Sequence, residues 1–323
     1  MEEVLEFKVD EEGDSLRLDL FLFDKLEGWS RSRCQTLIKS GKVKVNEKTV
    51  SKPAYNVKLN DVVQVTIEEA KQEEGLIPEN IPIDIIYQDN DIVVVNKPAG
   101  LVVHPAPGHP NGTLVNALLY HCKDYSPVSG DPLRPGVVHR LDMNTTGVLV
   151  FAKNPHAYLE LRRQVENREF KRRYLALVKG VPPHKEGIIE ASIGRSLCDR
   201  KRMSVTGVNS REAVTHYVVK ESFKYLSLLE LKLFTGRTHQ IRVHLKFIGY
   251  PVLGDPVYGF VDYHTLPLPE TVIRTMEKLP GQALHAQLLG LKHPTNNAYM
   301  EFTAPLPDYF NEILSLLRKS TKS

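Results

Sequence analysis

Near the start of the chain, the spacing of apolar residues predicts a helix followed by a second one. Leu18, Leu22 and Leu26 recur every four residues, and Asp14 or Ser15 precedes them in a position suited to capping a helix. A second amphipathic stretch follows directly. The chain therefore begins with a small helical pair.

The second helix and the segments after it complete a small module. Ser30 or Ser32 is expected to cap this helix, and Gly41 is expected to end it. The stretches KVKVNEKTV and VVQVTI then alternate between apolar and polar residues, which is typical of strands. We therefore predict a small α/β domain over residues 15–75.

The stretch EEAKQEEGLIPENIP has no apolar period and contains two prolines, so we interpret it as a linker. Beyond it, apolar stretches that predict strands outnumber those that predict helices, and their order is irregular. This pattern favours an α+β domain with a mixed, mostly antiparallel sheet over residues 82–315. A length of 323 residues suits two such domains.

Composition narrows the class of protein without naming a partner. A net charge of +3 is too small to indicate nucleic-acid binding by itself, so the placement of charge must decide. The three cysteines lie far apart and form no CxxC pair, which argues against a zinc knuckle or a disulfide framework. We find no signal peptide and no apolar stretch long enough to span a bilayer, and we expect a cytoplasmic monomer.

The first module carries a set of basic residues. Taken singly they are ordinary solvated charges, but together they suggest RNA-phosphate contacts: Arg17, Arg31, Arg33, Lys39 and Lys44. The stretch SRSRCQTLIKSGKVKVNEKTV resembles the RNA-binding module first recognised in ribosomal protein S4. That resemblance implies that the second helix and the following strand present basic residues to RNA.

The stretch HRLDMNTTG places Asp142 at the entrance to an apolar run, between polar neighbours. An aspartate in this position commonly caps backbone amides in a turn. The alternative is catalysis, because the adjacent Arg140 would favour its ionised form. The residue alone leaves both interpretations open.

A second polar stretch, TGRTHQIRVH, has helical periodicity. On a helix that begins near Thr235, Thr238 and Arg242 share a face, and the free amides at the helix start suit an anion. His239 and His244 are five positions apart and diverge on such a helix, and there is no HExxH pattern. The spacing argues against a metal site, and no phosphate-binding glycine loop is evident.

Six ordered stretches resemble the RluA/RluD family of RNA pseudouridine synthases. They are VNKPAGLVVHPAPG, HRLDMNTTGVLVFAKN, KRRYLALVKG, TGRTHQIRVH, GYPVLGDPVYG and LHAQLLGLKHP. The likeness covers nearly the whole chain and includes the N-terminal module. It implies the pseudouridine synthase fold and the isomerisation of uridine to pseudouridine in RNA, with neither a cofactor nor a metal.

The resemblance also assigns roles to individual residues. It implies that Asp142 is the essential catalyst, that Arg242 pairs with it, and that Tyr174 lies against the uracil. A core aromatic is the alternative for Tyr174. Arg140 would fill the space that the flipped base leaves in the RNA. Lys97 would either hold the floor of the site or contact phosphate, and we include it among the RNA-binding residues.

The substrate follows only from the closest branch of the family. The stretch HPAPGHPNGTLVNALLYH is most similar to the RluD branch, which implies action on large-subunit (23S) ribosomal RNA, free or in a pre-ribosomal particle. Two alternatives remain: the same chemistry on tRNA, and a non-catalytic RNA-binding protein that kept the scaffold. An intact Asp142, Tyr174 and Arg242 argue against the latter.

Overall fold

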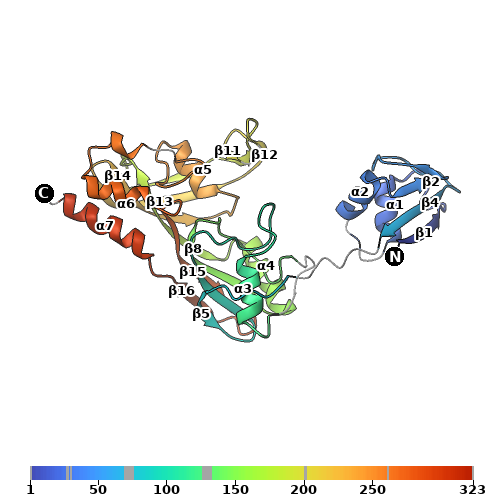
Figure 1. Ribbon diagram of the computed structural model, residues 1–323, viewed down its shortest axis with the longest axis horizontal. Helices are drawn as coiled ribbons and strands as arrows, with labels where there is room; N and C mark the ends of the chain where they lie inside the picture. The colour runs from blue at the N-terminus through green and yellow to red at the C-terminus, as the bar shows by residue number, and fades with distance from the viewer. Residues whose placement is uncertain are drawn as a thin grey trace. The chain divides into compact units, whose positions relative to one another are not determined.

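The computed structural model forms two compact units, Met1–Gly75 and Leu76–Ser323. It describes residues 2–26, 29, 31–68, 76–125, 133–199, 202–259 and 262–321 (Figure 1). Residues 69–75 of the segment interpreted as a linker lie outside the described residues. Among the described residues, no helix is both long and apolar enough to cross a membrane.

The N-terminal unit packs two helices on a four-stranded antiparallel sheet. Its strands run in the order β1-β4-β2-β3. The elements are β1 (Glu2–Lys8), α1 (Leu18–Lys25), α2 (Arg31–Lys39), β2 (Val43–Val45), β3 (Lys48–Thr49) and β4 (Val62–Glu68). Alternate valines of β2 and β4 meet Leu18, Leu22 and Ile38 in one apolar core. The apolar pattern of this module is therefore the pattern of its core.

Several local predictions for this unit were wrong. Strand β1 was not predicted, although it pairs along its whole length with β4. Helix α1 begins after Arg17, whose side chain does not cap it, while Asp14 instead accepts a hydrogen bond from the amide of Leu59 at 2.8 Å. Ser32 lies inside α2, and Ser30 is outside the described residues. Tertiary contacts have replaced the expected local caps.

The larger unit is built on a nine-stranded sheet, with strand order β5-β6-β7-β15-β8-β14-β13-β9 and β16 paired to β15. Its strands are β5 (Asp84–Gln88), β6 (Ile92–Lys97), β7 (Thr146–Ala152), β8 (Lys171–Lys179), β9 (Glu186–Glu190), β13 (Val214–Phe223), β14 (Leu226–Leu233), β15 (Leu284–Lys292) and β16 (Tyr299–Thr303). Only the β7–β15 pair is parallel. The predicted α+β class, with a mixed and mostly antiparallel sheet, is confirmed.

The remaining elements pack around this sheet (Figure 1). They are α3 (Leu114–His121), α4 (Pro155–Glu166), α5 (Gln240–Phe247), a 3-10 turn (Tyr263–Thr265), α6 (Glu270–Glu277), α7 (Asp308–Thr321), and a small sheet of β10 (Ile193–Arg195), β11 (Met203–Ser204) and β12 (Val208–Arg211). Helices α6 and α7 share an apolar cluster that includes Val272 and Phe310. Helix α6 thus belongs to a second core.

Two helix starts follow their sequence signals. Thr113 caps α3 and forms a reciprocal capping box with Asn116. Asn154 accepts a hydrogen bond from the amide of Ala157, and Pro155 occupies the first position of α4. In the sequence, strand β7 lies between these two helices, and all of its residues are buried. It therefore holds in place the segment just before it, which carries Asp142.

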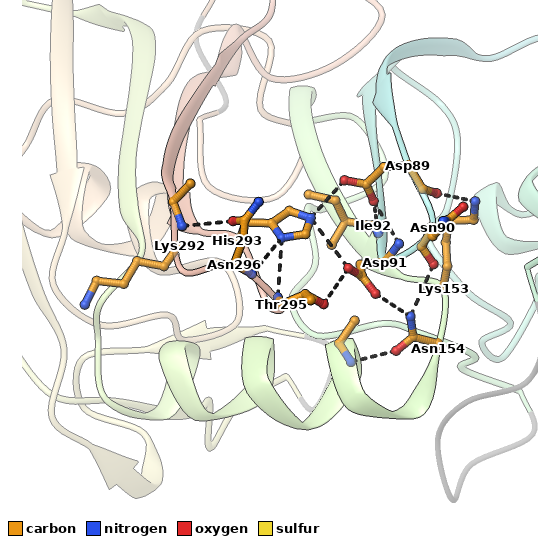
Figure 2. Close-up of polar contacts among 12 residues, drawn as sticks. Asp89, Asn90, Asp91, Ile92, Lys153, Asn154, Lys292, His293, Thr295 and Asn296 are labelled. Carbon is orange, nitrogen blue, oxygen red and sulfur yellow. Dashed lines mark hydrogen bonds and ion pairs between the residues drawn. The ribbon is translucent and has the colours of Figure 1, made fainter.

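A polar cluster joins the β5–β6 turn to the loop after β15 (Figure 2). Asp89 accepts hydrogen bonds from Tyr87 and from His293, the latter at 2.8 Å, and also from two backbone amides. Asp91 accepts from Thr295 at 2.6 Å and from Asn154 at 2.7 Å. Each carboxylate oxygen therefore has a protein donor, and the cluster acts as a clamp between loops that are 204 positions apart.

Candidate active site

The turn that carries Asp142 is held in place by β7 and β15. The amide of Thr145 donates to the carbonyl of Asp142 at 3.0 Å, which closes the turn. Gly147 follows with φ +111°, and a Cβ there would collide with the backbone of Ala286. Glycine is required at this point because β7 and β15 approach so closely. The Thr-Thr-Gly segment thus fixes where Asp142 stands.

Arg242 pairs with Asp142, although the two residues are 100 positions apart. Its Nη1 donates to Asp142 Oδ2 at 2.8 Å, and both side chains are largely shielded from solvent. The predicted pairing is therefore present in the structure. Asp142 lines the pocket, and Nε2 of His239 lies 3.9 Å from its Oδ1. Arg242 therefore anchors one carboxylate oxygen of Asp142.

Asp255 completes the site and was missed as a functional residue. Its Oδ2 accepts a hydrogen bond from Nε of Arg242 at 2.7 Å, and its Oδ1 accepts one from Nη2 at 2.8 Å. The side chain of Asp255 is fully buried. Burial by itself would raise the pKa of Asp255, but the hydrogen bonds and charge of Arg242 outweigh burial and lower it. The signal was available, since Asp255 lies in the quoted stretch GYPVLGDPVYG.

Helix α5 begins later than expected. It starts at Gln240 and not near Thr235, and the preceding His239 adopts a left-handed conformation with φ +57°. Thr238 therefore does not share a helical face with Arg242. The predicted anion site at a helix start near Thr235 does not form, because the segment folds instead around the buried side chain of Gln240.

Gln240 explains why this segment is irregular. Its side-chain oxygen accepts hydrogen bonds from the hydroxyl of Thr235 at 2.8 Å and from the amide of Arg237 at 2.9 Å. Its side-chain nitrogen donates to the carbonyl of Val214 and to the hydroxyl of Thr215. A buried amide whose hydrogen bonds are all satisfied favours one loop conformation. The loop that precedes Arg242 in the sequence is therefore held in one conformation.

The histidines of this segment diverge, as predicted. His239 contacts the hydroxyl of Tyr258 at 2.9 Å and lines the pocket. His244 points away and contacts Thr215 and the carbonyl of Ala191. Burial lowers the pKa of both imidazoles. These two side chains do not converge on a common point.

Asp142 and Tyr174 line one pocket of about 340 Å³, which lies at the lower end of the range for ligand sites. Tyr174 comes from β8 and is almost completely buried, and burial raises its pKa. Arg140 is exposed and also lines this pocket. The structure therefore brings four of the residues proposed from sequence together: Asp142, Tyr174, Arg242 and Arg140.

His139 supports the catalytic turn. Its Nε2 accepts a hydrogen bond from the amide of Val150 at 3.3 Å, and its ring meets the edge of Phe170. Burial, reinforced by the nearby Arg172, lowers the pKa of His139 to about 3. A ring that stays neutral near pH 7 and accepts from the backbone suits a structural role better than proton transfer.

The placement of Lys97 among the RNA-binding residues was wrong. Its side chain has no exposure, and Nζ donates to the carbonyls of Pro98, Leu101 and Met143 at 2.7–2.8 Å. An ammonium group has three donors, and all of them are used here. Lys97 therefore holds the residue after Asp142 from beneath and cannot reach RNA.

In the N-terminal unit, two of the predicted RNA-binding residues share a partner. Arg17 and Arg31 both donate to the buried carboxylate of Asp19, at 2.9 Å and 3.0 Å. Burial would raise the pKa of Asp19, but hydrogen bonds from Arg17, Gln35 and Arg31 lower it to about 2. One negative charge thus partly offsets these two guanidinium groups.

The other three basic residues lie on the surface of that unit. Arg33 stacks on Trp29, with its guanidinium carbon 3.8 Å from the ring centroid. Lys39 at the end of α2 and Lys44 on β2 are exposed. Arg33, Lys39 and Lys44 are therefore exposed basic residues of this unit.

Asp142, Arg242 and Asp255 thus form a carboxylate–guanidinium–carboxylate triad at the pocket, beside a large, mostly antiparallel sheet. Residues 91–247 match the family model described as RNA pseudouridylate synthase, and residues 16–63 match the S4 domain model. The chain belongs to the RNA pseudouridine synthase family, whose members are isomerases.

Individual relatives extend this likeness over almost the whole chain. This chain is 45% identical over 316 residues to RNA pseudouridine synthase YlyB of Bacillus subtilis, and the match covers 98% of this chain and 99% of that protein. It is 41% identical over 302 residues to ribosomal large subunit pseudouridine synthase D of Haemophilus influenzae, covering 94% and 91%. The structure of human RNA pseudouridylate synthase domain containing 1 matches with a TM-score of 0.55 and 26% identity, covering 74% of this chain and 96% of that one.

Proposed function

We propose that this protein isomerises specific uridines of large-subunit ribosomal RNA to pseudouridine, with Asp142 as the catalyst. The observation that carries the proposal is the Asp142–Arg242 pair, locked by Asp255 at the edge of the pocket. Two relatives named ribosomal large subunit pseudouridine synthase D, at 41% and 42% identity, support the choice of RNA. Cytoplasmic localisation and a monomeric state are parts of the same proposal.

The reaction breaks the bond between uracil N1 and ribose C1′ and forms one between C5 and C1′. Asp142 Oδ1 acts either as a nucleophile at C1′ or as a base on the sugar. The C5 hydrogen is then lost and N1 gains a proton, so that no atom or electron is added overall. One carboxylate held by an arginine suffices, and the chemistry needs no redox partner.

The target uridine must leave its base stack to reach Asp142. The exposed position of Arg140 at the pocket supports its role in filling the vacated space in the RNA. Tyr174 lines the same pocket, which supports a face-to-face contact with the uracil ring. Arg140 would then occupy the position that the base leaves, and Tyr174 would contact the base at the position that it reaches.

Substitution of Tyr174 tests the stacking role. Tyr174→Phe keeps the ring and is expected to retain activity within about fivefold, whereas Tyr174→Leu is expected to lose about 10- to 100-fold in kcat/KM, since stacking of a base on an aromatic ring contributes about 1–3 kcal/mol. The measurement is single-turnover formation of pseudouridine. Equal inactivity of the Phe and Leu variants would show that the hydroxyl is the essential group.

The N-terminal unit is proposed to bind RNA phosphates through Arg33, Lys39 and Lys44, with contributions from Arg17 and Arg31. Its match to the S4 domain and the exposure of its basic residues support this role. We also propose that residues 15–75 and 82–315 form separate domains. The separate apolar cores of the two units support that division.

Deletion of residues 1–75 should leave a folded catalytic unit that binds RNA more weakly. The affinity of this fragment for a stem-loop should depend less steeply on salt, because each lost phosphate contact removes close to one unit of slope. The measurement is binding of one stem-loop by both proteins across a salt series. Identical slopes would mean that the N-terminal unit does not touch that RNA.

The experiment that tests the function as a whole is pseudouridine mapping in RNA from cells with and without the protein. Loss of modification at large-subunit ribosomal uridines is expected. Loss confined to tRNA would keep the chemistry but change the substrate, and no loss in any RNA would favour a non-catalytic RNA-binding protein. Purified protein incubated with the mapped RNA then separates direct action from an indirect effect.

A further inference from the structure

One buried cation of the catalytic unit has no hydrogen-bond or ion-pair partner among the described residues. Arg172 on β8 is 8% exposed, and its Nε has neither solvent contact nor a hydrogen-bond acceptor. In the part of the chain that the structure describes, no carboxylate pairs with its guanidinium, whereas neighbouring Arg173 lies 3.7 Å from Glu230. An unpaired buried charge is costly unless a ligand completes its contacts.

Arg172 lies in the active-site pocket. It lines the cavity together with Asp142 and Tyr174, and it precedes Tyr174 by two positions on β8, so both point to the same face of the sheet. Gly236 lies beside its guanidinium, and a Cβ at position 236 would lie only 2.9 Å from Nη1. The missing side chain at position 236 leaves room beside the guanidinium.

The polar groups around Arg172 do not neutralise it. His139 is a neutral imidazole at pH 7, because burial and the charge of Arg172 itself lower its pKa. Tyr174 stays protonated, because burial raises its pKa. Asp142 is already paired with Arg242 through a 2.8 Å hydrogen bond. The guanidinium of Arg172 therefore keeps its positive charge in the pocket, where it can bind an anion.

We propose that Arg172 binds the phosphodiester of the target nucleotide, an inference that rests on the proposed RNA substrate. A flipped uridine brings its own phosphate to the pocket, and this group carries a permanent negative charge. The planar guanidinium matches phosphate oxygens in a forked geometry. Because the phosphate is bonded to the ribose, Arg172 holds the sugar where C1′ meets Asp142 Oδ1.

Nucleotide binding tests this role without requiring activity. The probes are uridine, uridine 3′-monophosphate and uridine 5′-monophosphate, titrated against the full-length protein. The wild type should bind one monophosphate about 10- to 100-fold more tightly than uridine, the range expected for a hydrogen-bonded charge. Arg172→Met should lose this preference, and Arg172→Lys should retain part of it.

Arg173→Met is the matched control. It removes the same charge from the next residue of β8, whose side chain lies on the opposite face of the sheet, and it should keep the wild-type preference. The proposal is overturned if Arg172→Met still prefers the monophosphate. It is also overturned if this variant loses affinity for uridine itself, since Arg172 would then contact the base.

Stability separates a binding role from a structural one. Arg172→Met removes an unpaired buried charge, so its melting temperature should equal or exceed that of the wild type. A lower melting temperature that accompanies weaker binding would point to a structural role and contradict the proposal. On RNA, the variant should raise KM far more than it lowers kcat, and a change in kcat alone would overturn the assignment.

The outcomes for Arg172 and for the proposed function are distinguishable. A wild-type protein that modifies no uridine in any RNA would refute the proposed function, while the nucleotide titration would still decide whether Arg172 binds phosphate. Conversely, normal RNA modification with no phosphate preference at Arg172 would refute only this inference.

Discussion

Asp142→Asn is expected to abolish pseudouridine formation while leaving RNA binding intact. The amide has nearly the same shape as the carboxylate and can still accept a hydrogen bond from Arg242, now 2.8 Å from Oδ2. It cannot serve as a nucleophile at C1′ or as a base on the sugar, so the loss in single-turnover rate should be about 10³-fold or more.

Two controls sharpen this test. Asp308→Asn makes the same change at an exposed position in α7 and should leave the rate unchanged. Binding of Asp142→Asn to a target RNA should stay within a few-fold of the wild type, which shows that the pocket has kept its form. A variant that turned over at close to the wild-type rate would remove Asp142 from the mechanism.

Sequence patterns predicted the parts of this fold that local physics controls. The apolar run that follows Asp142 forms β7, all seven residues of which are buried, and α4 begins after Asn154 with Pro155 at its first position. The turn after Asp142 consists of Met143 and Asn144, whereas Thr146 and Gly147 already belong to β7, where a Cβ at position 147 would collide with Ala286. These features depend on neighbouring residues, so a single sequence contains enough information to place them.

These local patterns could not predict side-chain contacts between residues that lie far apart in the sequence. Lys97 was placed among the RNA contacts, with holding the floor of the site as the equal alternative, and three backbone carbonyls surround its ammonium group. The start of α5 was misplaced because the side chain of Gln240 binds the preceding loop. The pairing of Arg242 with Asp142 came from family resemblance, and nothing in the spacing of the two residues requires it.

Arg242→Met is expected to impair both folding and catalysis, because it breaks two interactions at once. Asp255 would stay fully buried with only the backbone amides of Val257 and Tyr258 as donors. Leaving one partner of a buried ion pair unmatched costs about 3–5 kcal/mol in the free energy of unfolding. Asp142 would also lose its anchor, so activity should fall by at least about 100-fold.

The double variant Arg242→Met/Asp255→Asn separates these two effects. An asparagine at position 255 removes the unmatched charge and still accepts the amides of Val257 and Tyr258. The double variant should therefore recover most of the lost stability in denaturant unfolding, yet remain inactive. Recovery of activity along with stability would mean that Arg242 acts only on folding and not on Asp142.

The pH dependence of the single variant gives an independent check on the Arg242–Asp255 pair. In the wild type Arg242 lowers the pKa of Asp255, so this pair stabilises the fold above the ordinary aspartate range, and the contribution is lost as pH falls through the lowered pKa. In Arg242→Met, burial is opposed only by the amides of Val257 and Tyr258, so the pKa of Asp255 should rise. The stability deficit of the variant should thus be largest near neutral pH and shrink as the solution is acidified and Asp255 takes up a proton. Unfolding measured at several pH values checks this sign, and a deficit that stayed constant or grew on acidification would contradict the pairing as the source of the loss.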